Sequence, residues 1–344
     1  MSVCVPVRNG QRYLRACLDS ILAQSFTDFE LIICDNASTD ATESICLAYA
    51  QRDPRIRYVR QPKNVGPAGN FNTGLELAKG EYFHWQAHDD LISPDYLARC
   101  VEVLDADPSA VLVYPRAMII DDYADPIGPY DFVVDASTPD VRARFRRLLQ
   151  VRHRQHRNFE VFGLMRTAAA RQVPGGHRPF AHGDRIFMVR LALYGRLVQI
   201  EPRLFLARAH ANQSMQTLPR RALPGGAGYS VLTRWLGPGP LPPPEWWNPA
   251  LADRICFPDW NLMAEYRQAV AQTPHLSATE RIGCYAALAE WVLRFWPKLA
   301  RDVAFALETI VRRAIRAIRS AVSPATAAPP AQPRDLHPGG VRSG

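Results

Sequence analysis

Short apolar runs and helical patterns alternate along the first third of the chain. Five mostly apolar runs have the length and the flanks of buried strands, and they span residues 2–7, 29–34, 56–59, 81–86 and 110–114. Between them, apolar residues recur at helical spacing over 13–22, 41–50, 68–78 and 94–104. Strands that alternate with helices indicate βαβ units with right-handed crossovers. The pattern therefore predicts an α/β fold with a mostly parallel sheet flanked by helices.

The pattern loosens after residue 123. It predicts helices over 142–151 and 184–194, and strands over 159–165, 198–200 and 203–208. A stretch rich in Pro and Gly over 218–249 is typical of a linker. Three predicted helices follow, at 258–272, 278–295 and 297–322, before a Pro- and Ala-rich end. We therefore predict a sheet-bearing α/β domain over 1–215, a linker over 216–250, a helical region over 251–322 and a disordered tail over 323–344.

The composition of the 344-residue chain is that of a globular protein. Hydrophobic residues make up 47% and charged residues 22%, which excludes wholesale disorder and collagen-like repeats. The chain has 41 Lys and Arg against 33 Asp and Glu, a net charge of +8. This surplus is compatible with nucleotides, nucleic acids or acidic lipids as partners and does not choose among them.

The seven cysteines include no Cys-x-x-Cys pair, which favours reduced core thiols over a metal or disulfide framework. The N-terminus shows no signal-peptide pattern, and no apolar stretch reaches the roughly 18 residues of a membrane-spanning helix. These features predict a cytoplasmic protein.

Candidate chemistry begins where the predicted strands end, because ligands bind at the carboxyl ends of strands in such sheets. Asp35 directly follows the apolar run 29–34. Its carboxylate would accept a hydrogen bond from an imide N–H, such as that of uracil. The segment from Asp35 to Asp40 is also typical of a turn and helix cap, which is the simpler interpretation for Thr39 and Asp40. For Asp35 both interpretations stay open.

Two adjacent carboxylates, Asp89 and Asp90, follow the run 81–86. A divalent cation with oxygen ligands would explain them, since Mg²⁺ prefers one or two carboxylates together with substrate phosphates. The alternative is a helix cap ahead of Ser93-Pro94, where helix signals begin.

With these motifs in order, residues 2 to about 115 resemble family 2 glycosyltransferases. The resemblance is carried by Pro6-x-x-Asn9, Asp35-x-x-Ser38-x-Asp40, Asn64-x-Gly66, Ala78-x-Gly80-Glu81-Tyr82 and Asp89-Asp90. It is patchier to about residue 215 and does not extend beyond. The resemblance implies the GT-A fold, a divalent cation (Mg²⁺ or Mn²⁺) and inversion at the anomeric carbon.

The resemblance also assigns roles to single residues. Residues that it places on the nucleotide sugar are Pro6, Val7, Asn9, Asp35, Asn64, Gly66 and Asp89. Within this set Asp35 matches the base-binding aspartate. Asp89 matches the metal- and diphosphate-binding aspartate, with Asp90 beside it. One departure is Ala87, where the family often has a further Asp.

The acceptor hydroxyl needs a base, and Asp184 matches the family's catalytic aspartate. Gly183 stands where Glu is usual, and the alternative for Asp184 is a helix N-cap. His210 lies in a segment similar to the one that closes such domains, where it would reach the diphosphate or the metal. The basic cluster 152–157 lacks interleaved aromatic residues, so no nucleic-acid partner is expected. The absence of Gly-x-Gly-x-x-Gly after the first strand argues against a dinucleotide oxidoreductase.

We therefore predict a glycosyltransferase that moves a sugar from a UDP- or dTDP-sugar to a glycan or lipid-linked acceptor, in cell-surface polysaccharide biosynthesis. The alternative is a non-catalytic nucleotide-sugar or glycan-binding module on the same scaffold. Its signs would be Ala87 and Gly183 in place of the usual acids.

The last predicted helix carries an apolar stripe and a basic face. The stripe comprises Leu299, Val303, Leu307, Ile310, Ala314 and Ile318, and the basic residues are Lys298, Arg301, Arg312, Arg313, Arg316 and Arg319. Such a helix can lie in a membrane interface with anionic lipids. We therefore predict peripheral contact with the inner face of the cell membrane through 297–322. The alternative is that the stripe packs on the domain or on a partner subunit.

Overall fold

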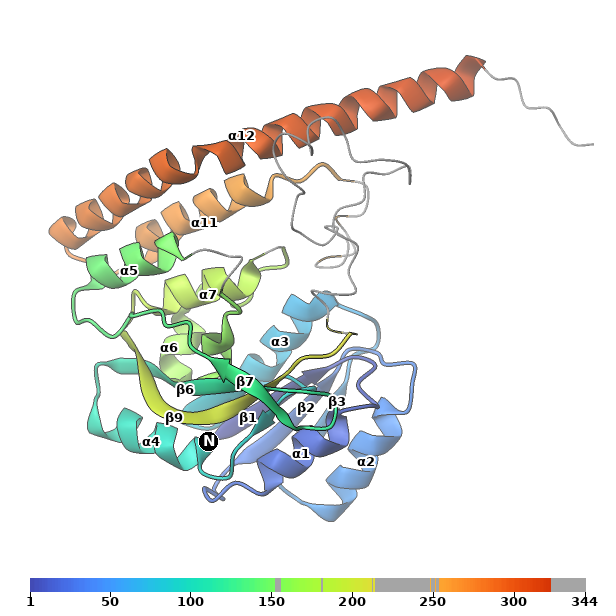
Figure 1. Cartoon of the computed structure of the whole chain (residues 1–344), viewed down its shortest axis with the longest axis vertical. Helices are drawn as coiled ribbons and strands as arrows, with labels where there is room; N and C mark the ends of the chain where they lie inside the picture. Colours follow the sequence, from blue (N-terminus) through green and yellow to red (C-terminus); the bar gives the residue numbers. More distant parts are fainter. Residues whose placement is uncertain are drawn as a thin grey trace, which may run out of the picture.

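The computed structural model describes residues 1–151, 156–180, 182–211, 213, 248, 251 and 254–322. Within them, one sheet has helices on both faces, and a layer of long helices lies beside it (Figure 1). The strands pair in the order β3-β2-β1-β4-β8-β6-β9-β5, and β7 pairs with β6. This arrangement confirms the predicted α/β sheet flanked by helices and its helical C-terminal extension.

The half of the sheet that the sequence predicts best is wholly parallel. It consists of β1 (Ser2–Val7), β2 (Glu30–Asp35), β3 (Ile56–Arg60) and β4 (Tyr82–Trp85). Its connecting helices are α1 (Leu14–Leu22), α2 (Thr42–Arg52) and α3 (Gly66–Leu77), and α4 (Tyr96–Ala106) follows β4. All six residues of β1 are buried. Val3 and Val5 join the core under α1 and α4, whereas Cys4 joins the core under α3, as the alternation of a strand requires.

The second half of the sheet differs from the sequence prediction. Its strands are β5 (Leu91–Ile92), β6 (Ala110–Ile120), β7 (Pro126–Tyr130), β8 (Leu164–Arg166) and β9 (Arg196–Arg208). The two short strands expected at 198–200 and 203–208 are one strand, because β9 pairs with β6 along its length. The strand expected over 159–165 is wrong in its first part. There a 3₁₀ turn over Phe159–Phe162 precedes β8, and the Tyr96 hydroxyl donates to the Phe162 carbonyl oxygen.

Four further helices complete the described structure: α5 (Val141–Gln150), α6 (Thr167–Gln172), α7 (Gly183–Leu191) and α11 (Pro258–Gln272), besides the terminal helix. The ring of Tyr266 on α11 packs against Phe145 of α5, with centroids 6.4 Å apart. Both residues share one core with Phe187 of α7. Among the described residues, the helical region therefore packs directly on the sheet-bearing part. The linker predicted over 216–250, except Asn248, and the tail predicted over 323–344 lie outside the described residues.

The terminal helix α12 (Ala278–Val322) is continuous, whereas the sequence predicts two helices divided at Pro297. Proline removes one helical hydrogen bond and crowds the preceding turn, so continuity needs support from outside the helix. That support follows directly after the proline. The Trp260 indole donates to the Leu299 carbonyl oxygen at 3.0 Å, and Asp302 accepts from the Asp259 backbone N–H at 2.6 Å. The second half of α12 then projects past α11 (Figure 1).

Asp302 makes the α11–α12 contact sensitive to pH. Burial raises the pKa of Asp302 to about 6, and the charge of Asp259 adds to the effect. The folded chain therefore binds this proton more tightly than the unfolded chain. As a result, the free energy of unfolding contributed by this group falls as pH rises from about 4 to about 6.

We predict that Asp302→Asn, which keeps an oxygen for the Asp259 N–H, removes this loss. Relative to the variant, the wild type should lose about 2–3 kcal/mol of stability between pH 4 and pH 7, measured by urea unfolding. Asp140→Asn is the matched control. Hydrogen bonding to Arg142 lowers the pKa of Asp140. The wild type should therefore gain stability relative to Asp140→Asn as pH rises, which is the opposite of the trend for Asp302→Asn. A difference for Asp302→Asn that does not change with pH would contradict the prediction.

Candidate functional site

The carboxyl ends of β1, β2 and β4 bring the predicted site loops to one edge of the sheet. In the parallel register Val7 lies beside Asp35, and Cys4 lies beside Trp85 at the end of β4. Pro6 and Val7 are buried residues of β1 itself, so the first loop begins after them. The Val7 carbonyl oxygen accepts from the Asn36 N–H at 2.8 Å, which continues the pairing of β1 and β2 beyond Asp35.

Asn9 fixes the first loop against the second. It adopts a left-handed backbone conformation with φ of 54°. Its side-chain oxygen accepts from the Thr39 N–H at 2.9 Å, and its own N–H donates to the Ser38 hydroxyl at 2.9 Å. Asp40 accepts from both the N–H and the hydroxyl of Thr42 at the start of α2, although the N-cap residue itself is Ala41 and not Asp40 as the sequence predicts.

Asp35 is fully buried, and hydrogen bonds engage both of its carboxylate oxygens. Oδ1 accepts from the Ser38 N–H at 2.9 Å and from the Ser38 hydroxyl at 2.5 Å. Oδ2 accepts from the Tyr58 hydroxyl at 2.7 Å and from the Arg60 guanidinium at 2.9 Å. A carboxylate offers about four acceptor positions, so none remains for a ligand in this conformation. Arg60 is 36% exposed at its side chain, which makes it the partner most easily displaced.

Asn64 and Gly66 shape the start of α3. The Asn64 side-chain oxygen accepts from the Gly66 N–H and from the Asn36 amide, both at 2.9 Å. Gly66 has φ of 77°, a conformation that favours glycine. Asn36 also accepts from the Val65 N–H at 2.8 Å, so one asparagine ties the second loop to the third.

Asp89 and His210 meet across 121 residues of sequence. The His210 Nε2 atom lies 3.0 Å from Asp89 Oδ2, while the Asp89 side chain stays 19% exposed. Burial alone would raise the pKa of Asp89, but the charge of His88 and the hydrogen bond from His210 outweigh it and lower that pKa. The structure thus joins two of the residues that the sequence proposes for the metal.

Asp90 points inward, and its environment differs from that of Asp89. It is buried, and its Oδ1 accepts from the Arg208 N–H at 2.7 Å. Burial and the neighbouring charge of Asp89 raise its pKa well above the usual range. The two carboxylates therefore have separate environments: Asp89 at the opening of the site and Asp90 against the backbone of β9.

The buried guanidinium of Arg208 holds this corner together. Its Nε donates to the Asp89 carbonyl oxygen at 2.8 Å. One terminal nitrogen donates to the carbonyl oxygens of Asp121 and Asp122, at 2.6 and 2.9 Å. The guanidinium carbon lies 4.9 Å from the centre of the Tyr13 ring. Arg208 thereby links β9 to the loops that follow β4 and β6.

Tyr13, the residue directly before α1, closes the same corner. Its hydroxyl donates to Asp122, and its ring lies 4.6 Å from that of His210. Burial and the Asp122 hydrogen bond raise the pKa of Tyr13 to about 12, so the phenol is protonated at neutral pH. Gly10 lets the first loop reach His88, because a Cβ there would lie 2.7 Å from the His88 ring.

Asp184 occupies the first turn of α7, the helix whose Phe187 packs on the end of β4. It precedes Phe187 by three residues and therefore shares a face of the helix with it. The Phe187 ring packs against Trp85 of β4, with centroids 5.0 Å apart. The absence of a side chain at Gly183 is required, since a Cβ there would lie 2.2 Å from the Arg178 carbonyl oxygen.

His177 lies between these elements. Its ring stacks on Phe187 at 5.2 Å and meets Trp85 edge-on at 4.7 Å. Burial lowers the pKa of His177 to about 4, so the ring is neutral at pH 7. The Asn72 side chain holds the backbone of His177 through two hydrogen bonds, of 2.7 and 3.0 Å.

The residues at the opening fit a divalent cation only with help from a substrate. Within the described ranges, no group of three or more His, Cys, Asp or Glu residues is arranged to hold a metal ion. Asp89 and His210 nevertheless present a partly exposed carboxylate and an imidazole whose buried Nδ1 has no hydrogen-bond partner among the described residues. Because Mg²⁺ takes one or two carboxylates together with substrate phosphates, this pair fits a cation shared with a diphosphate.

Sequence reasoning did not single out several residues of the site. They are Tyr13, Asn36, Tyr58, Arg60, Asp122 and Arg208. Most of them act through contacts between segments far apart in sequence, which no local pattern reports. The adjacent acids Asp121 and Asp122 are visible in the sequence, but the strand predicted there ends at residue 114, whereas β6 runs to Ile120, directly before them. Of the cluster 152–157, only His156 and Arg157 are described, and His156 Nε2 lies 2.8 Å from buried Glu160.

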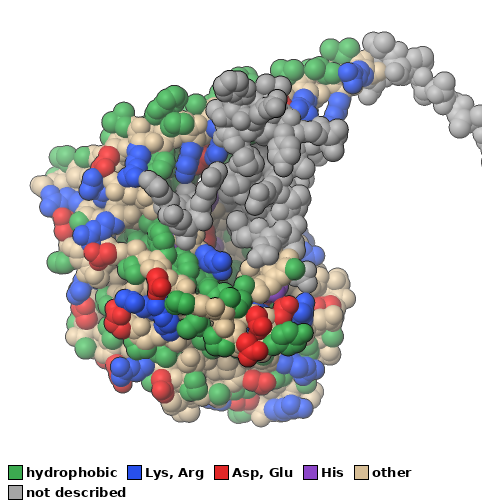
Figure 2. Space-filling view, in the orientation of Figure 1, with side chains coloured by type: hydrophobic (Ala, Val, Ile, Leu, Met, Phe, Trp, Pro, Cys, Tyr) green, Lys and Arg blue, Asp and Glu red, His purple; other side chains and the backbone are tan. Residues whose placement is uncertain are grey.

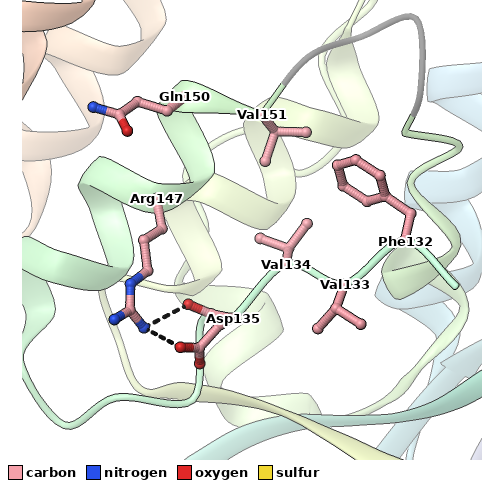
Figure 3. Close-up of a pocket in the computed structure, with 7 residues that line it drawn as sticks. All are labelled: Phe132, Val133, Val134, Asp135, Arg147, Gln150 and Val151. Atoms are coloured by element: carbon pink, nitrogen blue, oxygen red, sulfur yellow. Dashed lines mark hydrogen bonds and ion pairs between the residues drawn. The ribbon is translucent and has the colours of Figure 1, made fainter.

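A separate pocket of about 360 Å³ lies between α5 and the segment that precedes it (Figure 3). It is lined by Phe132, Val133, Val134, Asp135, Arg147, Gln150 and Val151. None of these residues comes from the loops after β1, β2 or β4, so the pocket is distinct from the site built around Asp89.

Six of the seven cysteines are buried, and Cys256 is half-buried. No helix among the described residues combines the length and the apolar character needed to cross a bilayer.

Comparisons with known proteins agree with this geometry. The sequence model of glycosyl transferase family 2 matches residues 2–173. An uncharacterized glycosyltransferase of Rickettsia typhi is 37% identical over 122 residues, which are 35% of this chain and 37% of that protein. Chondroitin synthase of Escherichia coli is 35% identical over 121 residues, 35% of this chain and 18% of the synthase. The aligned residues are thus 37% of the Rickettsia protein and 18% of the synthase, so the similarity covers only part of these relatives.

Among solved structures, residues 1–349 of S. aureus TarS share the fold. One structure has a TM-score of 0.55 at 16% identity and covers 86% of this chain and 72% of TarS 1–349. A second structure, in complex with UDP-GlcNAc, has a TM-score of 0.57 at 15% identity, and the match covers 90% of this chain and 80% of the TarS chain.

We predict that Arg208→Ala destabilises the protein by about 3–5 kcal/mol, because it leaves the buried carbonyl oxygens of Asp89, Asp121 and Asp122 without their side-chain donor. Urea unfolding measures the change. Arg12→Ala is the control, since Arg12 pairs with Asp122 only at the surface, and its loss should cost less than about 1 kcal/mol. Equal effects of the two substitutions would show that Arg208 does not hold the corner together.

Proposed function

Because the chain belongs to glycosyl transferase family 2, we propose that it transfers a sugar from a nucleotide-diphosphate donor to an acceptor hydroxyl, with inversion at the anomeric carbon. The observation that carries the proposal is the joining of Asp89 and His210 at the carboxyl edge of β4. The loop that ends in Asp35 lies at the same edge. Partly exposed acidic and imidazole groups at this place suit a donor diphosphate and its cation.

We propose a UDP- or dTDP-sugar as the donor. Both bases carry an imide N–H that Asp35 would accept. This role requires Arg60 to leave Asp35 Oδ2 and frees its guanidinium for the charged part of the donor. The complexes of TarS with UDP and UDP-GlcNAc support a uridine donor for this fold.

Asp89, with His210, would hold a Mg²⁺ or Mn²⁺ ion between the protein and the donor diphosphate. When bound, the ion neutralises charge that develops on the departing diphosphate. His210 would also fix the orientation of the Asp89 carboxylate through their hydrogen bond. Asp90 supports the loop from behind, because its carboxylate is directed to the backbone of β9.

Asp184 is proposed as the general base. It would take the proton of the acceptor hydroxyl while that oxygen bonds to C1 of the sugar. The bond from C1 to the diphosphate breaks at the same time, and its electron pair leaves with the nucleoside diphosphate. The position of Asp184 at the start of α7, one turn before the Phe187 that packs on the end of β4, supports this role.

For the acceptor we propose a glycan or a lipid-linked glycan, within cell-surface polysaccharide biosynthesis. A lipid-linked acceptor would place the enzyme at the inner face of the cell membrane, as a peripheral protein in the cytoplasm. The basic, amphipathic end of α12 supports this location.

The second candidate is a non-catalytic nucleotide-sugar or glycan-binding module. Ala87 favours it, because the family often has a further carboxylate there. Gly183 favours it less, since the Arg178 carbonyl oxygen leaves no room for any side chain at that position.

Asp184→Asn tests the proposed reaction. The variant keeps the size of the side chain and an oxygen but cannot accept the proton. We expect turnover to fall by about 10² or more, while donor affinity changes little. The measurement is release of nucleoside diphosphate from a panel of UDP- and dTDP-sugars, with and without Mn²⁺, alongside calorimetric donor binding. Donor binding by a wild type that releases no product with any acceptor would favour the non-catalytic module.

Asp35→Asn tests recognition of the base. We expect it to weaken UDP binding by about 1.5–3 kcal/mol, because the amide replaces one charged acceptor. Arg60→Met is the matched control, since it removes a competitor for Asp35 while leaving the carboxylate in place. It should weaken binding less than Asp35→Asn does. Unchanged UDP affinity in Asp35→Asn, with a lowered melting temperature, would assign Asp35 to the turn alone.

A further inference from the structure

One face of α12 is apolar, uncharged and exposed over most of the helix. Its residues recur at spacings of three and four: Ile282, Ala286, Ala289, Leu293, Trp296, Ala300, Val303, Leu307, Ile310, Ala314 and Ala317. Every one of them is exposed, and Leu293 reaches 78% and Trp296 reaches 61%. We call these residues the outer face of α12. At 1.5 Å per residue, it extends for about 50 Å.

The opposite face explains why the outer one is left exposed. Trp291, Leu299 and Phe305 are buried, and the contacts with α11 lie on their side of the helix. The sequence placed Leu299 in one apolar stripe with Val303 and Leu307, but Leu299 is buried and therefore does not belong to the exposed face. The exposed stripe instead continues backward across Pro297 to Ile282, because α12 is a single helix.

Beyond residue 306 the two faces of α12 separate completely. Val311, Ile315 and Ile318 widen the apolar side, and all three are exposed. The polar side over 307–319 carries four arginines against one acid, Glu308, which pairs with Arg312 at 2.8 Å. Figure 2 shows hydrophobic side chains along the outer side of the projecting end and Lys or Arg side chains beneath it.

This combination selects one kind of partner. Soluble proteins rarely expose an apolar strip of such length, so a cover is expected. A second copy of α12 packed on the outer face would double the number of arginines on the projecting end and would bring no additional acid beyond Glu308 to pair with them. An anionic lipid surface instead receives the apolar side chains between its headgroups and attracts the arginines that border them. Trp296, with its large amphipathic ring, suits the depth of the headgroups.

We propose that the outer face of α12, from Ile282 to Ala317, lies in the interface of a bilayer that contains anionic lipids. The contact thus begins well before Pro297 and includes the half of the helix that packs on α11. It rests on the exposure and charge of α12 and not on the proposed transfer reaction. Loss of transferase activity would therefore leave it intact.

Flotation of the full chain with vesicles tests the proposal. Wild type should float with vesicles of phosphatidylcholine and phosphatidylglycerol, and much less with phosphatidylcholine alone. Leu307→Glu combined with Ile310→Glu should reduce partitioning by about a hundredfold or more, since burying each of the two side chains is worth about one power of ten. Both residues are exposed, so the melting temperature should stay unchanged.

The matched control is Arg316→Gln combined with Arg319→Gln, which changes the net charge by the same amount on the polar side. It should weaken partitioning by at most about thirtyfold at low salt, because each arginine near an anionic surface contributes at most a factor of about five. Equal losses in the two double variants would overturn the proposal, because attraction by charge alone would then explain binding. Failure of wild type to float with anionic vesicles would overturn it as well.

Trp296 provides a second measurement, at the half of the helix that precedes Pro297. Brominated acyl chains in anionic vesicles should quench part of the tryptophan fluorescence, and Trp296→Phe should remove that part. Quenching that is the same in Trp296→Phe would overturn the extended contact. Light scattering tests the alternative that a second copy covers this face. That alternative would hold if the wild type is a dimer, the Leu307→Glu with Ile310→Glu variant is a monomer, and both bind vesicles equally.

Discussion

The buried guanidinium of Arg208 is the interaction on which the site depends. The guanidinium donates to carbonyl oxygens in the loops after β4 and β6. The backbone N–H of Arg208 donates to Asp90. A buried charge is costly unless its hydrogen bonds are made, so the geometry of these loops is tightly constrained. This constraint directs Asp90 inward and leaves Asp89 at the opening beside His210. A pair of adjacent acids thus becomes one structural and one exposed carboxylate.

The same principle acts at Asp35, with a different outcome. Its four hydrogen bonds stabilise the charge within the sheet edge and occupy the acceptor positions that a base would use. In the proposed complex, ligand binding at Asp35 would therefore exchange one partner for another rather than occupy a free position. Under the proposed function, Arg60, which is 36% exposed at its side chain, would couple the base position to the charged part of the donor.

Two glycines show how close packing limits what the loops can contain. Gly10 admits the His88 ring, and Gly183 admits the Arg178 carbonyl oxygen. At Gly183 this packing accounts for a departure from the family's usual acid without invoking loss of catalysis. The departure at Ala87 has no such explanation, which is why the non-catalytic alternative still rests on it.

The sequence by itself determined the parallel half of the sheet and placed Asp35 and Asp89 after their strands. It could do so because alternation, helical spacing and turn residues are local signals that need no knowledge of distant contacts. Only the tertiary structure decided that His210 meets Asp89, that β9 is one strand and that α12 continues without a break at Pro297. Each of these depends on contacts between residues far apart in the chain, such as Trp260 with Leu299. The exposed outer face of α12 follows from the same cause, because packing against α11 decides which side of a largely apolar helix is left outside.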